Sequence, residues 1–297
     1  MQFGGHLQFS GSLAVRSRLT LVAAAALIVL AGSVTPRAWG PVGHHVVARI
    51  ALARLTPAAK AATAAILGSE DFVAISTWAD SVRAERPETA NWHFVDVPFG
   101  ETSYVPSRDC PHTETGDCVI AEILRVQRDV ANPMLNPVRR KEALQFLIHF
   151  VGDLHMPLHT IDHQDKGGND QMVEVAGYTP NTPSRYPPNL HSAWDSILLG
   201  LRGIDEETYT ADLLRALSLN PLSAESIDPV KWALEGHAIA EAVVYAYPGF
   251  DRAAPPSGVV KLDAAYQKRA APVIDRQMQR AGVRLAMMLN EALAAGR

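Results

Sequence analysis

Two histidine–aspartate pairs with the same spacing are the residues of this chain best suited to chemistry. His149 and Asp153 stand four residues apart in HFVGDLHMPLHT, which also contains His159. His191 and Asp195 repeat that spacing in NLHSAWDS. On a helix, residues i and i+4 project from one face, so each pair presents an imidazole beside a carboxylate. One pair is also typical of a hydrogen bond on a helix surface. Two pairs indicate a hydrolytic site with several divalent metals, with Zn2+ the first candidate because it accepts N and O ligands.

Further candidate ligands lie in short contexts rich in tryptophan. His93 lies in NWHFVDVP and Asp80 in STWADSVR, while Trp39 and His44 lie in WGPVGHH. A free N-terminal amine beside its own main-chain carbonyl can chelate a metal in a five-membered ring. If Trp39 becomes the first residue after processing, the cut itself completes a metal site.

Residues 1–38 have the pattern of an export signal. Arg16 and Arg18 precede an apolar run, LTLVAAAALIVLA, and a polar tail follows. The run is too short to span a bilayer comfortably, so we interpret it as a cleaved signal peptide, the alternative being an uncleaved anchor. Cleavage after Ala38 would expose Trp39, but Pro36 stands where a small residue is preferred, so the signal alone does not fix the cut.

The mature chain is acidic. Removing residues 1–38 takes away three arginines and no acid, which changes the formal net charge from −4 to −7. Without metals, such a chain would repel nucleic acid, because non-specific binding depends on positive charge. Zinc ions gathered in one cleft would supply the attraction for phosphate there.

The chain has two cysteines, Cys110 and Cys118, within CPHTETGDC. In an exported protein this spacing favours a short-range disulfide. The alternative is a pair of free thiols in a reducing compartment. Both interpretations give the pair a structural role.

The pattern of apolar residues predicts one mostly α domain over residues 39–297. Helical spacing extends through 44–67 with a break at Pro57, and it recurs further along the chain over 142–155, 205–218, 229–247 and 262–294. One short strand is expected within 171–176, and proline and glycine predict loops at 176–189 and 248–258. Pro157 is expected to interrupt the helix between Asp153 and His159.

Six motifs in order resemble the zinc-dependent single-strand nucleases of the S1/P1 type. They are WGxxGH, WAD followed by Arg83, WHFxDV, HFxGDxHxPLH, GGN at 167–169 and NLHSxWD, and the likeness continues into a C-terminal helix from Gln277 to Asn290. The resemblance covers essentially the whole mature chain. It implies a compact single-domain helical bundle of the zinc-dependent phospholipase C and S1/P1 nuclease type.

The resemblance also implies three zinc ions per chain and assigns their ligands. Asp80, His93, His149 and Asp153 match the ligands of one zinc. Trp39, through its amine and carbonyl, and His44 match those of a second, which Asp153 bridges to the first. The ligands of the third correspond to His159, His191 and Asp195.

Family members hydrolyse phosphodiesters of single-stranded DNA and RNA to 5′-mononucleotides and often remove 3′-phosphates from nucleotides. Two zinc ions sharing a water lower its pKa toward about 7 and so supply hydroxide. A third can stabilise the charge on the leaving 3′-oxygen. Asp80 is expected to hydrogen-bond the attacking water and Arg83 to neutralise the transition state. The alternative for Arg83 is an ion pair with a surface acid.

The substrate side of the site is expected to include an aromatic platform. Phe94 matches the family's stacking residue and Asp96 its acceptor for base-edge donors; the alternatives are a core phenylalanine and a turn or cap aspartate. The GGN motif adds Asn169 as a substrate-binding candidate. Tyr178 and Tyr186 are candidates for a second stacking platform, on residue type and neighbourhood alone.

Two rival functions remain open at the level of sequence. A zinc-dependent phospholipase C has similar ligands, but that family typically has glutamate where this chain has Asp195. A non-catalytic zinc-binding exported protein would have closed coordination, whereas these ligand sets leave positions open for water and substrate. We expect an exported monomer, periplasmic or secreted, that does not bind membranes after signal cleavage and acts on single-stranded DNA, RNA and 3′-nucleotides.

Overall fold

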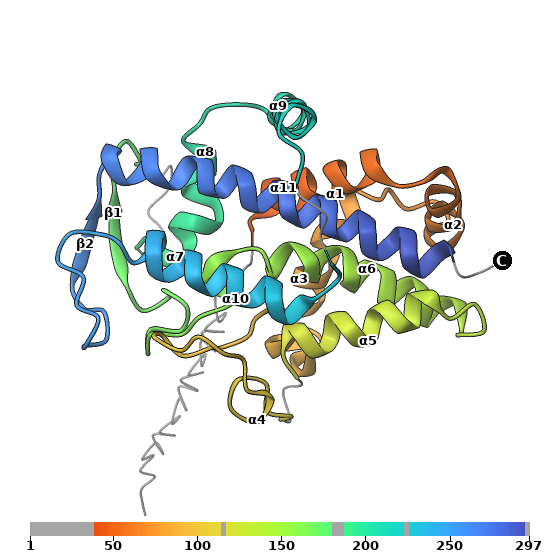
Figure 1. Cartoon of the computed structure of the whole chain (residues 1–297), viewed down its shortest axis with the longest axis horizontal. Coiled ribbons are helices and arrows are strands. Elements are labelled where there is room, and N and C mark those ends of the chain that lie inside the picture. Colours follow the sequence, from red (N-terminus) through yellow and green to blue (C-terminus); the bar gives the residue numbers. More distant parts are fainter. Residues whose placement is uncertain (1–38, 114–116, 180–186, 223–225, 295–297) are drawn as a thin grey trace, which may run out of the picture. The chain divides into compact units, whose positions relative to one another are not determined.

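The chain folds into a bundle of helices with one small sheet at its edge (Figure 1). The computed structural model describes residues 39–113, 117–179, 187–222 and 226–294, which belong to one compact unit. The predicted signal peptide, residues 1–38, lies outside the described residues and stays a prediction. The elements in the first half are α1 (Pro41–Arg54), α2 (Pro57–Leu67), η1 (Ala74–Thr77), α3 (Trp78–Val82), η2 (Pro87–His93), α4 (Pro106–Asp109), α5 (Val119–Ala131), α6 (Pro137–Asp153) and η3 (Pro157–His159). The second half contains β1 (Met172–Val175), α7 (Leu190–Ser192), η4 (Ala193–Ile197), α8 (Leu198–Gly200), α9 (Glu206–Leu219), α10 (Pro229–Ile239), η5 (Ala240–Val244), β2 (Val259–Leu262) and α11 (Ala264–Ala294).

Several helices begin at a proline, where the missing N–H leaves no hydrogen bond unmade. Pro41, Pro57, Pro137 and Pro229 each stand in the first turn of their helix. Side chains just before some of these prolines accept hydrogen bonds from free backbone amides, as Asn136 does for α6. The sequence thus defines where these helices begin.

The helix α6 forms the centre of the bundle. Every residue from Ala143 to Asp153 is buried, because α3, α5, α11 and η1 pack around it. The long helix α11 crosses the bundle and packs against α1, α2, α5 and α6 (Figure 1). A helix buried on all sides must be apolar all round, so polar residues on α6 need a specific reason to be there.

The predicted fold class, mostly α in a single domain, is confirmed, with differences at element ends. The helix predicted over 142–155 starts earlier, at Pro137, and ends at Asp153. The helix predicted over 229–247 becomes α10 followed by the wider turns of η5. The break at Pro157 is present, because η3 begins there.

The strand predicted within 171–176 is β1, and its partner was not predicted. β2 pairs parallel with β1, with Met172 opposite Val259 and Val175 opposite Leu262. The sequence analysis predicted a loop up to residue 258 and a helix from 262, and so missed this strand. Two-stranded parallel pairing joins distant segments, and no local pattern encodes it.

The predicted disulfide is confirmed, since Cys110 and Cys118 are bonded. It closes the segment that leads from α4 into α5. Among the described residues, no helix is long and apolar enough to cross a membrane.

Replacing Gly282 by alanine is expected to destabilise the fold. At Gly282, α11 lies so close to α1 that an added Cβ would stand 2.4 Å from Ile50 Cγ2 and 3.0 Å from the Val47 carbonyl oxygen. Overpacking of this kind costs about 1–3 kcal/mol of unfolding free energy, measurable by thermal or denaturant unfolding. Gly200→Ala is the matched control, because nothing lies within 4 Å of its Cβ position. Equal stability of the two variants would show that the helices separate without cost.

Candidate metal centre

Four polar side chains converge at the buried end of α6. His93 Nδ1 lies 2.8 Å from Asp153 Oδ2, and His149 Nε2 lies 3.2 Å from the same oxygen. Asp80 Oδ1 is 3.8 Å from His149 Nε2 and 4.0 Å from His93 Nδ1. These are the four residues that the resemblance assigns to one zinc, and the structure brings them together.

Each of the four comes from an element that fixes its direction. His149 and Asp153 lie one turn apart on α6, Asp80 lies in α3, and His93 ends η2. His149 Nδ1 donates a hydrogen bond of 2.7 Å to the Ser76 carbonyl oxygen, which leaves Nε2 facing the cluster. A second hydrogen bond of this kind is the usual way in which proteins orient a metal-binding histidine.

His44 begins a second set of candidate metal ligands, at the other carboxylate oxygen of Asp153. His44 Nε2 lies 3.2 Å from Asp153 Oδ1, and its ring stacks on His149 with centroids 4.0 Å apart. A Cβ at Gly152 would stand 2.9 Å from His44 Nδ1, so this helix position needs glycine. Asp153 therefore contacts both sets, one through each carboxylate oxygen.

Trp39 precedes α1 and is completely buried. The next residue, Gly40, donates its N–H to the Asp195 carbonyl oxygen at 2.9 Å, and a Cβ there would stand 2.2 Å from Ser196 Oγ. The start of the predicted mature chain is thus held against η4, the element that carries Asp195.

A third group forms around His159 and His191. Their Nε2 atoms lie 3.2 Å apart, and their Nδ1 atoms donate to the carbonyl oxygens of His93 and Gly167, each at 2.7 Å. Asp195 is buried in η4, four residues after His191. Among the described residues, the sets of three ligand atoms within 4.8 Å of one another come from the first two groups and do not include this one.

The GGN motif shapes the wall next to His191. Gly167 has φ +59°, and a Cβ there would stand 2.4 Å from the Leu158 carbonyl oxygen. Only glycine tolerates both the conformation and the close approach. The carbonyl group that orients His191 is held in place by this packing.

The charges of the cluster fit a cation. Although burial alone would lower the pKa of His149, the carboxylates of Asp153 and Asp80 raise it to about 9. Burial lowers the pKa of His93 to about 4 and also lowers the pKa of His44. The pKa of Asp153 falls well below its ordinary value, because three histidines outweigh the effect of burial. Two imidazoles are thus neutral at pH 7, the form that binds metals.

Several buried polar atoms at this centre have no hydrogen bond. They include Asp80 Oδ1, Asp153 Oδ1 and His44 Nε2. Buried polar groups are usually hydrogen-bonded, and metal ions at the two ligand sets would give these atoms bonds that the fold itself does not supply. The donor set of imidazole nitrogens and carboxylate oxygens suits Zn2+.

A pocket of about 280 Å³ opens beside the cluster. Arg83, Phe94 and Asp96 line it together with His93, His159, His191 and Asn169. Arg83 is buried; its Nη1 lies 3.9 Å from Asp80 Oδ1, and its Nη2 donates to the Ala90 carbonyl oxygen at 3.1 Å. Arg83 thus stands between Asp80 and the pocket.

Asp96 is an exposed residue that lines the pocket, and protein atoms surround much of its carboxyl. Burial raises its pKa to about 7, and the charges of Asp162 and Asp109 act in the same direction. Such a carboxyl can exchange a proton near neutral pH, so it can accept or donate a hydrogen bond to a ligand in the pocket.

Of the two tyrosine candidates, Tyr178 is not among the described residues that line this pocket. Tyr178 lines a separate groove along β1 and β2, and Tyr186 lies outside the described residues. Asn169 lines the pocket but donates its Nδ2 hydrogen bond to the Lys166 carbonyl oxygen at 2.7 Å. The sequence analysis missed Lys166 and Asp162 as lining residues, although both closely precede the GGN motif.

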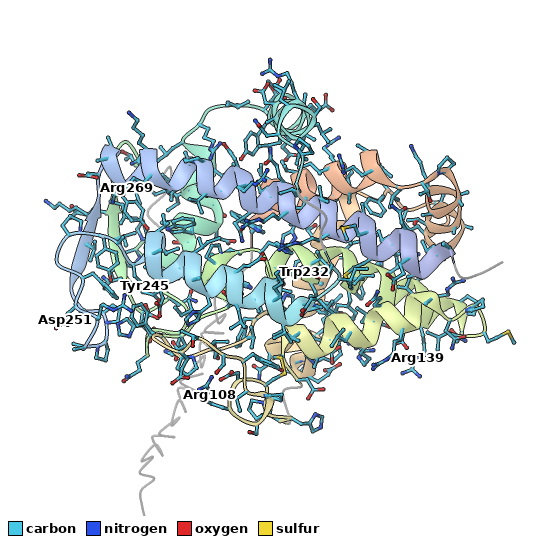
Figure 2. The ribbon with its side chains drawn as sticks, in the orientation of Figure 1. Arg108, Arg139, Trp232, Tyr245, Asp251 and Arg269 are labelled. Carbon is cyan, nitrogen blue, oxygen red and sulfur yellow. A yellow bond between two sulfur atoms is a disulfide. The ribbon has the colours of Figure 1, made fainter. Side chains whose placement is uncertain are left out.

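Five described histidines outside these ligand sets contact other parts of the fold. His155 is buried and accepts a hydrogen bond of 2.9 Å from Arg284 Nη1, while Gln277 Nε2 donates to its carbonyl oxygen at 3.0 Å. Arg284 also lies 5.1 Å over the ring of Trp232 on α10, a side chain labelled in Figure 2. α11 thereby anchors the corner between Asp153 and His159. Of the others, His45 contacts Glu206, His112 contacts Asp117, His163 stacks on Phe99, and His237 contacts the Pro98 carbonyl oxygen.

Comparison with known proteins agrees with this site. The family model "S1/P1 Nuclease" matches residues 39–294. Endonuclease 2 of Arabidopsis thaliana is 31% identical over 85% of this chain and 89% of its own length. Nuclease P1 of Penicillium citrinum is 29% identical over 85% of this chain and 97% of its own length. Nuclease S1 of Aspergillus oryzae is 26% identical over 85% of this chain and 91% of its own length. The chain belongs to the S1/P1 nuclease family and is a nuclease.

Proposed function

We propose that this protein hydrolyses phosphodiester bonds of single-stranded DNA and RNA to 5′-mononucleotides, and removes 3′-phosphates from nucleotides, at a site of three zinc ions. The observation that carries this proposal is the pairing of a buried His–Asp cluster with an open pocket lined by Arg83, Phe94 and Asp96. An arginine and an aromatic ring beside a metal centre suit a phosphate joined to a base.

The ligand sets follow from the convergence of side chains on Asp153. The first zinc site is formed by Asp153 together with Asp80, His93 and His149. The second is formed by Asp153 together with His44 and the amine and carbonyl of Trp39. The third site would be held by His159, His191 and Asp195. Bound zinc ions would lower the pKa of a shared water toward about 7 and so provide hydroxide as the nucleophile.

The protein's own residues bind and orient the substrate. Arg83 lies at the pocket wall beside Asp80, so its guanidinium can hold two phosphate oxygens at once. Asp80 can also accept a hydrogen bond from the attacking water. Phe94 offers a ring to a base, and a base must leave its duplex stack to use it, which accounts for the preference for single strands.

Export would follow from the predicted signal peptide, and removal of residues 1–38 is part of this proposal. Cleavage at Ala38 would release the Trp39 amine next to the position of His44. Whether the product stays in the periplasm or enters the medium has no bearing on the chemistry.

The test uses the protein that begins at Trp39. It is incubated with single-stranded DNA, RNA or phosphatidylcholine, with and without a chelator that is later back-titrated with zinc. We expect both nucleic acids to be hydrolysed to 5′-nucleotides. No nucleotides should be released in the presence of the chelator, and the activity should recover when zinc is added back. Cleavage of phosphatidylcholine alone would identify a phospholipase instead, and zinc binding with no cleavage would identify a non-catalytic protein.

Replacing Phe94 by alanine is expected to raise KM for single-stranded DNA. Stacking on an aromatic ring is worth about 1–3 kcal/mol per base, which corresponds to a rise of roughly five- to a hundredfold, with a smaller effect on kcat. Steady-state kinetics on an oligonucleotide measure this. Leu219→Ala, an exposed apolar truncation at the end of α9, is the control. An unchanged KM for Phe94→Ala would assign this ring to the core.

A further inference from the structure

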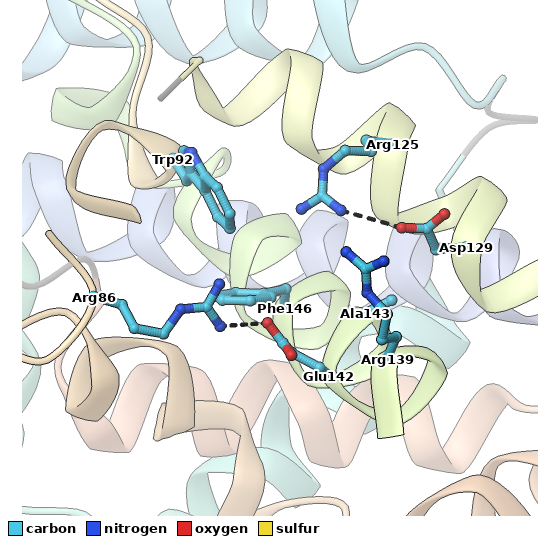
Figure 3. A pocket seen from close by; sticks show the side chains of 8 residues that line it. All are labelled: Arg86, Trp92, Arg125, Asp129, Arg139, Glu142, Ala143 and Phe146. Carbon is cyan, nitrogen blue, oxygen red and sulfur yellow. Dashed lines mark hydrogen bonds and ion pairs between the residues drawn. The ribbon is translucent and has the colours of Figure 1, made fainter. Parts of the chain in front are cut away.

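A second pocket, of about 370 Å³, lies outside the metal centre (Figure 3). Three guanidinium groups enter it from three segments: Arg86 before η2, Arg125 on α5 and Arg139 on α6. Trp92 and Phe146 form its aromatic wall. The cationic and aromatic side chains of this pocket are those that proteins use to bind the backbone and bases of single-stranded nucleic acid.

The guanidinium groups of Arg86 and Arg125 are held against the aromatic wall. Arg86 Cζ lies 5.9 Å from the centroid of Trp92 and 5.5 Å from that of Phe146, and Arg125 Cζ lies 5.1 Å from Trp92. Trp92 in turn packs edge-on against Phe146 with centroids 5.3 Å apart. Stacking fixes the plane of each guanidinium and leaves edge N–H groups for an anion.

Two of these arginines are already balanced by carboxylates. Arg86 pairs with Glu88 and Glu142, and Arg125 pairs with Asp129 and Glu122. These ion pairs hold the side chains in position, and the four carboxylates more than cancel the two positive charges. The pocket's attraction for an anion must therefore come from the third arginine.

Arg139 is that third arginine, and its side chain is exposed. No partner for its guanidinium lies within ion-pair distance in the described part of the chain, whereas Arg140 beside it donates to the Val130 carbonyl oxygen. Arg139 lies in the first turn of α6, where the helix dipole disfavours a positive charge. Figure 3 shows its side chain turned toward the pocket and the Arg125–Asp129 pair.

The pocket lies directly behind the wall of the catalytic pocket. Along η2, Asn91 and His93 line the catalytic pocket, and Trp92 between them lines this one. Likewise, Arg83 lines the catalytic pocket and Arg86, three residues later, lines the second pocket. The two pockets therefore lie on either side of the segment Pro87–His93.

We propose that this pocket is a second subsite for the substrate, in which Arg139, supported by Arg86 and Arg125, binds a backbone phosphate of a single strand that extends beyond the catalytic pocket. The proposal rests on the proposed function. The subsite binds long strands more tightly without acting on the bond that is cleaved.

The experiment compares two substrates, a dinucleotide and a single-stranded oligomer of about twelve nucleotides, within the span of single-strand sites on one domain. For Arg139→Ala, we expect KM for the oligomer to rise roughly three- to tenfold with kcat unchanged, and KM for the dinucleotide to stay unchanged. The slope of log KM against log salt for the oligomer should fall by about 0.7, the value for one phosphate contact on a single strand. Arg128→Ala is the matched control, because it removes the same charge from an exposed site on α5 that does not line the pocket.

Other outcomes overturn the proposal. An unchanged oligomer KM, an equal rise for both substrates, or the same rise in Arg128→Ala would each do so. Loss of inorganic phosphate binding in calorimetry without a change in oligomer KM would assign the pocket to free anions. If the wild-type protein cleaves nothing, the proposed function fails separately. The affinities of the wild type, Arg139→Ala and Arg128→Ala for the labelled, uncleaved oligomer are then compared by fluorescence anisotropy. Equal affinities of the wild type and Arg139→Ala would overturn the subsite.

Discussion

Asp153→Asn is expected to lower kcat/KM for single-stranded DNA by at least about a thousandfold, since metal ions stabilise such transition states by several kcal/mol. One carboxylate oxygen of Asp153 faces His93 and His149, and the other faces His44. Asparagine keeps the shape of the side chain but offers one oxygen and no charge, so one ligand set loses its oxygen donor and both lose the negative charge. Kinetics with zinc analysis of the purified variant measure the effect, and zinc content should fall together with activity.

The matched control for this variant is Asp212→Asn, which removes a carboxylate from an exposed ion pair on α9. It should retain wild-type kinetics and zinc. A thermal unfolding curve of Asp153→Asn in zinc separates lost chemistry from lost folding. Activity of the folded Asp153→Asn variant within tenfold of the wild type would mean that Asp153 does not join two metal sites.

Retaining one residue ahead of Trp39 is expected to lower activity by about a hundredfold or more, through loss of one of two metals that act together. Acylation converts the N-terminal amine into an amide, whose nitrogen is not a metal donor. Trp39 is fully buried and Gly40 is tied to Asp195, so the chain start has little freedom to move aside. The measurement compares kcat/KM and zinc content of chains beginning at Trp39 and at Ala38.

An alanine added after Arg297 is the control for this extension, since it lengthens the chain by the same amount at the other end. That variant should match the wild type. Full activity of the chain beginning at Ala38 would show that the amine is dispensable and that His44 acts without it.

The sequence predicted that His149 and Asp153 lie together because their spacing is local. His149 and Asp153 are set by one turn of α6, and the break before His159 is set by Pro157. The pairing of His44 with Asp153 depends on the packing of α1 against α6. Periodicity alone does not give that packing, and only the resemblance anticipated it.

Features that depend on tertiary contacts escaped prediction. β2 is a strand because β1 lies beside it, and helix α5 was not anticipated at all. Lys166 reaches the catalytic pocket because the close approach of Gly167 to Leu158 folds the GGN loop inward. The pocket at Arg139 combines three segments far apart in the chain, so no single motif marks it.

The most direct test of the trinuclear zinc site is anomalous diffraction at the zinc edge from crystals of the protein beginning at Trp39. Three peaks are expected: one between Asp80, His93 and His149, one between His44 and the Trp39 amine, and one beside His159 and His191. Asp153 should lie between the first two. The absence of a peak between His93, His149 and Asp153 in zinc-loaded, active protein would contradict this assignment of the catalytic centre.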